Sequence, residues 1–258
     1  MIKKIWPLIL FASIILMFVF LTGLIISITI TNGGEKKQET LPEATEPIQT
    51  EPSSTNKAIL VLGDSIGFGV GDDPDMGLGK RYAALIDPEK NMEVVNLSVS
   101  GAISSELAAL VTAPENAPYI AAADLIIISI GGNDLSRLQS EDARSLEVIF
   151  QETFNAYKEN LETTLSRIRA LNPEVQIALV GLYNPYPEQD PRTSQKFFEW
   201  NYKTQLMADA DLKTAYIPTD DAFKYHLDTY LAADRFHPSN IGYQVIAEAL
   251  DRVLNGID

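Results

Sequence analysis

Five short apolar runs recur along the chain after residue 57, and longer stretches separate them. The runs are AILVLG, EVVNL, DLIIISI, VQIALVG and TAYIP, at residues 58–63, 93–97, 124–130, 175–181 and 214–218. Their length and their content of Val, Ile and Leu are typical of strands that are buried inside a protein. The sequence therefore predicts five buried β-strands.

Two of the stretches outside these runs carry apolar residues at helical spacing. The first stripe stops at Asn172-Pro173, where a helix would end, and the second begins after Ser239, a good N-cap, and stops before Gly256. Strands that alternate with helices predict an α/β fold with a parallel sheet covered on both faces, and ligands bind such sheets at the carboxyl ends of the strands. The two stripes consist of Phe154, Tyr157, Leu161, Leu165, Ile168 and Leu171, and of Tyr243, Ile246, Ala247, Leu250, Val253 and Leu254.

The N-terminus carries a long uncharged segment. Trp6 to Ile30 is a run of 25 residues without a charge, preceded by Lys3 and Lys4, and it is long enough to cross the roughly 30 Å hydrocarbon core of a bilayer. The two lysines favour a cytoplasmic N-terminus, which would place the rest of the chain outside the membrane. A cleaved signal peptide, and hence a secreted protein, is the alternative, but the run exceeds the usual h-region and no A-x-A-like site follows it. We predict a transmembrane anchor over residues 1–31.

Residues 32–56 differ in composition from what precedes and follows them. They are rich in Glu, Thr, Gln and Pro and hold almost no large apolar side chains, so burial cannot offset the entropy of ordering them. We expect a disordered polar linker here, followed by one folded domain over residues 57–258. That domain holds 16 basic and 30 acidic residues, a balance that repels phosphate backbones and argues against nucleic acid as a partner.

A candidate nucleophile follows the first predicted strand. The strand leads into Gly63-Asp64-Ser65-Ile66-Gly67, so Ser65 would emerge at a strand's carboxyl end on a turn whose glycines permit close approach of the backbone. A turn that merely reverses the chain has the same composition. The chain has no cysteine, which excludes a thiol nucleophile, zinc-thiolate sites and disulfides.

A serine hydroxyl needs a base, and the chain offers two histidines, His226 and His237. Asp234 precedes His237 by three residues in a loop that leads into the last predicted helix, so its carboxylate can reach the imidazole Nδ1–H within a single turn. His226 lies in a mixed polar stretch and is interpreted as a surface or partly buried histidine. One Asp-x-x-His match is common by chance, so its weight comes from combination with the other motifs.

Acyl transfer also needs hydrogen-bond donors for a developing oxyanion. Gly131-Gly132-Asn133-Asp134 follows the third run, and the Asn133 side chain can donate at the same rim as Ser65. Gly101 follows the second run and could present a bare backbone N–H. Each of these residues alone is also compatible with a turn or a helix cap.

Together these blocks resemble, in order, the signature of the SGNH (GDSL-type) hydrolases, over residues 57–258, with the bacterial lysophospholipase-like and envelope-associated members as the most similar branch. The resemblance implies a flavodoxin-like three-layer α/β/α fold with a five-stranded parallel sheet. It implies Ser65 as nucleophile, His237 as base and Asp234 as its orienting partner, with an oxyanion hole made by Ser65 N–H, Gly101 N–H and Asn133. No metal and no cofactor is implied.

The sequence Gly63-x-Ser65-x-Gly67 also fits the G-x-S-x-G elbow of α/β-hydrolases. Two features favour the SGNH interpretation. Ser65 follows the first strand of the domain, and Asp234 and His237 share one loop, whereas α/β-hydrolases take the acid and the histidine from separate loops.

The sequence thus predicts a serine esterase or lipase that acts outside the membrane on a small-molecule, lipid or acylated-glycan ester. Acyl transfer to an envelope glycan and an inactive domain that binds a glycan or a partner are the alternatives. The walls of the substrate pocket are expected in loops such as 68–79 and 183–193. Candidate lining residues are Tyr183, Tyr186, Phe197, Phe198 and Trp200, although core packing is favoured for Phe197 and Trp200.

Overall fold

The computed structural model describes residues 57–89, 91–136, 143–187 and 191–256. These residues belong to one compact unit, Ser54–Asp258. The predicted anchor at 1–31 and the predicted linker at 32–56 lie outside the described residues. Within the described ranges, no helix is both long and apolar enough to cross a membrane.

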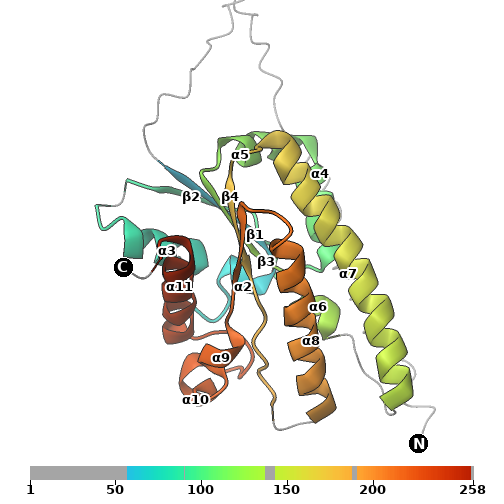
Figure 1. Cartoon of the computed structure of the whole chain (residues 1–258). Coiled ribbons are helices and arrows are strands. Elements are labelled where there is room, and N and C mark those ends of the chain that lie inside the picture. Colours follow the sequence, from blue (N-terminus) through green and yellow to red (C-terminus); the bar gives the residue numbers. More distant parts are fainter. Residues whose placement is uncertain (1–56, 90, 137–142, 188–190, 257–258) are drawn as a thin grey trace, which may run out of the picture. The chain divides into compact units, whose positions relative to one another are not determined.

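The sheet has five parallel strands (Figure 1). Their order is β2-β1-β3-β4-β5, which is the flavodoxin-like order, and it confirms the predicted α/β fold with a five-stranded parallel sheet. Each strand lies within the apolar run that predicted it. The strands are β1 (Ala58–Gly63), β2 (Glu93–Asn96), β3 (Leu125–Ser129), β4 (Gln176–Val180) and β5 (Thr214–Ile217).

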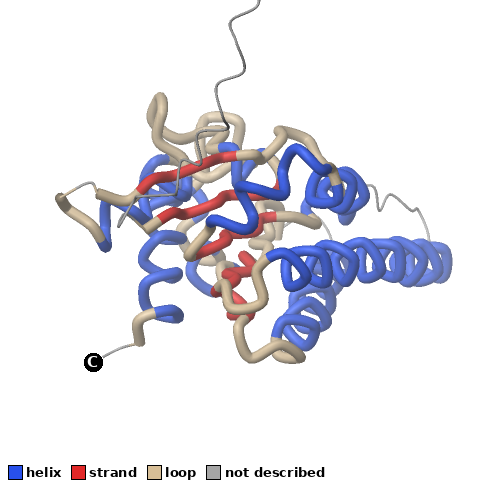
Figure 2. Tube along the Cα trace, turned by 90° about the horizontal axis from the view of Figure 1, so that it is seen from above, coloured by secondary structure: helices blue, strands red, loops and turns tan. Residues whose placement is uncertain are grey.

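Helices cover both faces of this sheet, as the view in Figure 2 shows. On one face lie α3 (Leu78–Ile86), α9 (Asp220–Phe223) and α11 (Asn240–Leu254), and α10 (Leu227–Tyr230) packs on α11. On the other face lie α4 (Ser104–Thr112), α5 (Ala117–Ala122), α7 (Ala143–Leu171) and α8 (Pro191–Ala208). Three short elements sit in the connecting loops: α2 (Ser65–Phe68), α6 (Gly132–Leu135) and η2 (Pro114–Asn116).

Each face of the sheet has its own apolar core. Successive side chains of a strand point to opposite faces, so Leu60 and Leu62 pack under α4 and α7 while Ile59 and Val61 pack under α3 and α11. The first core is centred on aromatic rings of α7 and α8, where Tyr157 and Trp200 have ring centroids 4.5 Å apart. These two cores hold the strand ends, and the loops that follow them, in fixed positions.

One strand differs from its prediction. The run at 93–97 was predicted to be buried, but Glu93 and Asn96 of β2 are exposed and the two valines between them are only half-buried. The prediction of burial is wrong here because β2 lies at the edge of the sheet, where β1 is its single neighbour.

Candidate active site

Ser65 lies at the carboxyl end of β1, as the first residue of α2. The chain turns there at Gly63, whose φ of +128° favours glycine, and a Cβ on Gly63 would lie 1.9 Å from the carbonyl oxygen of Ser129. Glycine therefore lets β1 and β3 remain close where they end, and the Asp64 N–H donates to that same carbonyl at 2.9 Å. The turn sets the Ser65 hydroxyl at the rim of the sheet.

Asp64 holds the start of α2 in place. Its carboxylate accepts hydrogen bonds from the Ile66 backbone N–H and from the Ser129 hydroxyl, both at 3.0 Å. The side chain is buried, with 2% of its surface exposed. Burial raises the pKa of Asp64 to about 6, and the hydrogen bonds from Ile66 and Ser129 oppose that rise. Asp64 thus positions Ser65 through the backbone rather than by direct contact.

Asp234, His237 and Ser65 form a continuous chain of hydrogen bonds. His237 Nε2 lies 2.9 Å from Ser65 Oγ, and His237 Nδ1 lies 2.6 Å from Asp234 Oδ2. The other oxygen, Asp234 Oδ1, accepts from the backbone N–H groups of Phe236 and His237 at 3.0 Å each. The structure therefore brings together the three residues that the sequence singled out as nucleophile, base and orienting acid.

The surroundings of Asp234 keep it ionised. Partial burial raises its pKa, but the hydrogen bonds from the His237 ring and from the Phe236 and His237 backbone outweigh it, so the pKa of Asp234 lies below its ordinary value. An ionised carboxylate at Nδ1 favours the tautomer in which Nε2 is free to accept a proton from a serine hydroxyl.

A short antiparallel bridge shapes the loop that carries Asp234 and His237. Leu231 pairs with Pro238, and the Ala232 N–H donates to the His237 carbonyl at 2.8 Å. The backbone passes through a left-handed conformation at Arg235, with φ of 56°. This closed loop holds the acid and the base on one rigid turn ahead of α11.

The loop after α2 packs directly on the histidine loop. A Cβ on Gly71 would lie 2.5 Å from the Pro238 carbonyl oxygen and 3.1 Å from the His237 Cβ, and Gly71 has a φ of +90°. The Tyr243 hydroxyl, from α11, donates to the Val70 carbonyl at 2.9 Å. These contacts fix the distance between the Ser65 and His237 segments.

Two of the predicted oxyanion-hole residues, Gly101 and Asn133, lie on segments that are joined by a hydrogen bond. The Asn133 side-chain amide, in α6, donates to the Ala102 carbonyl at 2.9 Å. This bond uses one of the two N–H groups of the amide, and the second can serve a substrate oxygen. Gly101 has a φ of +85°, and open space surrounds the position of a Cβ there. Asn133 is thus tied to the loop that contains Gly101.

Asp134, which is buried, also connects α6 to the segment that follows Gly101. Its carboxylate accepts from the Ser104 hydroxyl at 2.6 Å and from the Ser104 backbone N–H at 3.0 Å. Asn160 of α7 donates to that hydroxyl at 3.0 Å. Taken alone, Asp134 is compatible with a turn or a helix cap. The structure gives it the specific task of anchoring the start of α4 to α6.

Other predicted residues lie apart from this hydrogen-bond chain. His226 is exposed and packs against Tyr230, as expected of a surface histidine. Tyr186 lines a groove, whereas Tyr183 and Trp200 are buried in the cores. Phe198 is 72% exposed on α8. Among the residues that the structure describes, no group of three or more His, Asp or Glu side chains could hold a metal ion.

The structural roles of Asp64 and Gly71 are not predicted by the sequence. Asp64 was named only as part of a turn motif, and its burial under Ser129 depends on the pairing of β1 with β3. Gly71 contacts a segment more than 160 residues further along the chain. The turn composition of 63–71 was the available signal, but it does not identify the partner of either residue.

Several known proteins are similar to this chain in sequence or in structure. The model of the GDSL-like lipase/acylhydrolase family matches residues 61–245, which include Ser65, Asp234 and His237. The uncharacterized protein YpmR of Bacillus subtilis is 29% identical over 199 residues, which are 74% of this chain and 78% of YpmR. The spore germination lipase LipC of Bacillus licheniformis is 31% identical over 199 residues, which are 73% of this chain and 92% of LipC. A lipase from a goat rumen metagenome superimposes with a TM-score of 0.66 at 28% identity, over 76% of this chain and 96% of that lipase.

Proposed function

Because the chain belongs to the GDSL-like lipase/acylhydrolase family of ester hydrolases, we propose that it cleaves carboxylic esters through an acyl-enzyme on Ser65. The observation that carries this proposal is the hydrogen-bond chain from Asp234 through His237 to Ser65 Oγ. Its two short links give the geometry that a serine nucleophile needs for activation by a histidine base.

In the first step, Ser65 Oγ attacks the carbonyl carbon of the ester while His237 Nε2 takes the hydroxyl proton. The resulting imidazolium is stabilised by the Asp234 carboxylate at Nδ1. The carbon–oxygen bond to the alcohol then breaks, and His237 returns its proton to the leaving alcohol oxygen. The acyl group remains on Ser65 as an ester.

In the second step, water replaces the alcohol. His237 takes a proton from the water, whose oxygen attacks the acyl carbon, and Ser65 recovers its proton when the carboxylic acid leaves. In both steps the carbonyl oxygen becomes an oxyanion, for which the N–H groups of Ser65, Gly101 and Asn133 are the proposed donors.

The first test is an assay of short p-nitrophenyl esters and a lysophospholipid with the protein and its Ser65→Ala variant. We expect kcat/KM to fall by about 10³-fold or more in the variant, because the residual rate would come only from binding and the oxyanion hole. A fluorophosphonate probe should label Ser65, identified by peptide mass spectrometry. Labelling of a different residue, or equal activity of both proteins, would rule out the acyl-enzyme on Ser65.

The oxyanion hole has its own test. Asn133→Ala should lower kcat by about 10²- to 10³-fold with little change in KM, because a donor to an oxyanion acts mainly in the transition state. Asn116→Ala is the matched control, since the Asn116 amide also donates to a backbone carbonyl, that of Leu110, at 2.8 Å. A similar loss in both variants would assign Asn133 to structure alone.

Transfer of the acyl group to another hydroxyl is the alternative from the same site. It differs only in the second step, where a sugar or lipid hydroxyl would replace water at the acyl carbon. Product analysis with and without added glycan acceptors separates the two reactions. If Ser65 becomes acylated and turnover requires the acceptor, the protein is a transferase.

A further inference from the structure

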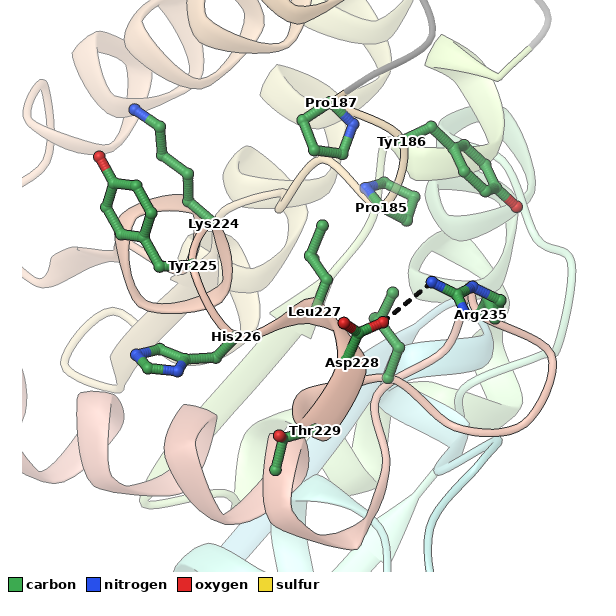
Figure 3. Close-up of a pocket in the computed structure, with 11 residues that line it drawn as sticks. Pro185, Tyr186, Pro187, Lys224, Tyr225, His226, Leu227, Asp228, Thr229 and Arg235 are labelled. Carbon is green, nitrogen blue, oxygen red and sulfur yellow. Dashed lines mark hydrogen bonds and ion pairs between the residues drawn. The ribbon is translucent and has the colours of Figure 1, made fainter.

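A groove of about 570 Å³ lies beside the loop that carries Asp234 and His237 (Figure 3). Arg235, between these two residues, forms part of its wall. Leu231, whose backbone pairs with Pro238, lines it as well. The groove and the candidate base therefore share one loop.

Contacts between rings connect the groove to His237. Tyr186, which lines the groove, stacks on Phe236 with the ring centroids 6.2 Å apart. Phe236 in turn meets His237 edge to face, with the ring centroids 4.9 Å apart. A substrate that extends from Ser65 past His237 would pass along these rings before it reaches the groove.

The chemistry of ester cleavage assigns this side to the alcohol. His237 returns its proton to the alcohol oxygen, so that oxygen must lie next to His237 Nε2. The carbonyl oxygen points instead toward the proposed donors Gly101 and Asn133, which belong to other loops. The groove is thus placed to receive the alcohol part of the ester and not its acyl chain.

The walls of the groove combine flat apolar surfaces with polar groups. Figure 3 shows Tyr186 and Tyr225 on opposite sides, with Pro185 and Pro187 between them. Tyrosine offers an apolar ring face and a polar hydroxyl. A sugar ring has the complementary surface, because its C–H faces are apolar and its rim carries hydroxyls that donate and accept hydrogen bonds.

The charged side chains of the groove are Lys224, Arg235 and Asp228. The Arg235 guanidinium is paired with the Asp228 carboxylate at 3.0 Å, and such a pair can donate to one sugar hydroxyl and accept from another. Lys224 lies over the ring of Tyr225 and would also attract an anionic group, so a phosphate ester belongs among the probes.

We propose that this groove binds the carbohydrate part of an O-acylated oligosaccharide, so that the ester is cut from a sugar hydroxyl. The inference rests on the proposed ester hydrolysis at Ser65 and adds its substrate class. Two ring contacts separate His237 from the groove, so a ligand that reaches from Ser65 into the groove must be longer than a single sugar.

The test compares acetyl esters that differ only in their alcohol. The probes are ethyl acetate, 1-acetyl-glycerol 3-phosphate, and mono-O-acetylated cellobiose, xylobiose and N,N′-diacetylchitobiose. We expect kcat/KM for the best disaccharide ester to exceed that for ethyl acetate at least tenfold. Tyr225→Ala should remove most of this ratio, because Tyr225 lines the groove and is 77% exposed. A ratio of rate constants is insensitive to a partly unfolded preparation.

Tyr119→Ala is the matched control, since Tyr119 is 47% exposed on α5, outside the groove. It should leave the ratio unchanged. Asp228→Ala should lower kcat/KM for the disaccharide ester, because an acceptor for hydroxyls is lost.

Three outcomes would overturn the inference. Disaccharide esters no better than ethyl acetate would do so, and Ser65-dependent cleavage of p-nitrophenyl acetate would still support the proposed function. A preference for the glycerol phosphate ester that grows in Asp228→Ala would identify an anion site. Equal losses in Tyr225→Ala and Tyr119→Ala would show that the groove does not set the preference. Absence of Ser65-dependent turnover on every ester would defeat the proposed function itself.

Discussion

Folding buries the carboxyl group of Asp64 next to the proposed nucleophile. Most acidic side chains that the structure describes are exposed, and Asp64 differs because β1 and β3 close over it. Folding raises its pKa from 3.8 to about 6, so the folded state favours the protonated form. The free energy of unfolding that Asp64 contributes is therefore greatest below pH 3.8, declines between pH 3.8 and about 6, and is constant above that range.

Substitution of Asp64 tests this pH dependence of stability. Asp64→Asn keeps an oxygen that can accept from Ile66 N–H but cannot ionise, so its stability relative to the parent should rise between pH 4 and pH 7, by about 3 kcal/mol. Chemical denaturation across that range measures the difference. Asp209→Asn, at an exposed position, corrects for the loss of one negative charge. Parallel stability curves for Asp64→Asn and the parent would contradict the shift.

Some residues of the candidate site can be predicted from the sequence, and others cannot. Ser65, Asp234 and His237 were predicted because each stands in a short local motif, and the structure brings them within hydrogen-bond distance of one another. Asp64 and Gly71 were not assigned their roles. Both act through contacts between segments far apart in the chain, and no local pattern names the partner.

At the scale of elements, the strands were predicted more completely than the helices. The strand runs are dense in Val, Ile and Leu because helices cover the sheet, and only the edge strand β2 departs from that burial. The long α7 and the C-terminal α11 carry wide apolar stripes. By contrast α3 and α4 are nine residues long, so an apolar stripe repeats over fewer than three turns in each and is a weak signal.

The contact between the Gly71 loop and the histidine loop is the element-scale feature with a direct functional consequence. Gly71→Ala adds a methyl group 2.5 Å from the Pro238 carbonyl at a φ of +90°. We expect the free energy of unfolding to fall by about 1–3 kcal/mol and kcat to fall more than KM rises, because His237 is displaced from Ser65. Denaturation and steady-state kinetics measure the two effects.

Gly256→Ala is the control that separates backbone strain at a glycine from displacement of His237. Gly256 also has a positive φ, of +81°, but open space surrounds the position of its Cβ. It should show the backbone strain without the loss of kcat. If both alanine variants keep the parental kcat, the Gly71 contact does not position the histidine.

At the scale of the whole molecule, the uncharged run from Trp6 to Ile30 remains a prediction about location. We propose that it anchors the protein and that residues 57–258 face the outside of the membrane. In bacterial cells the full chain should stay in the membrane fraction after alkaline carbonate extraction, and residues 57–258 alone should be released. External protease should digest the domain in spheroplasts. A soluble product shortened near residue 31 would identify a cleaved signal peptide instead.

The Ser65–His237 hydrogen bond joins residues 172 positions apart in the chain. Asp234 and His237 lie on one turn and can find each other locally, but Ser65 belongs to the end of the first strand and His237 to the loop before the last helix. The bond can form only when both ends of the domain have folded against each other. Catalytic activity would therefore report complete folding, because any intermediate whose C-terminal helix has not yet docked would be inactive.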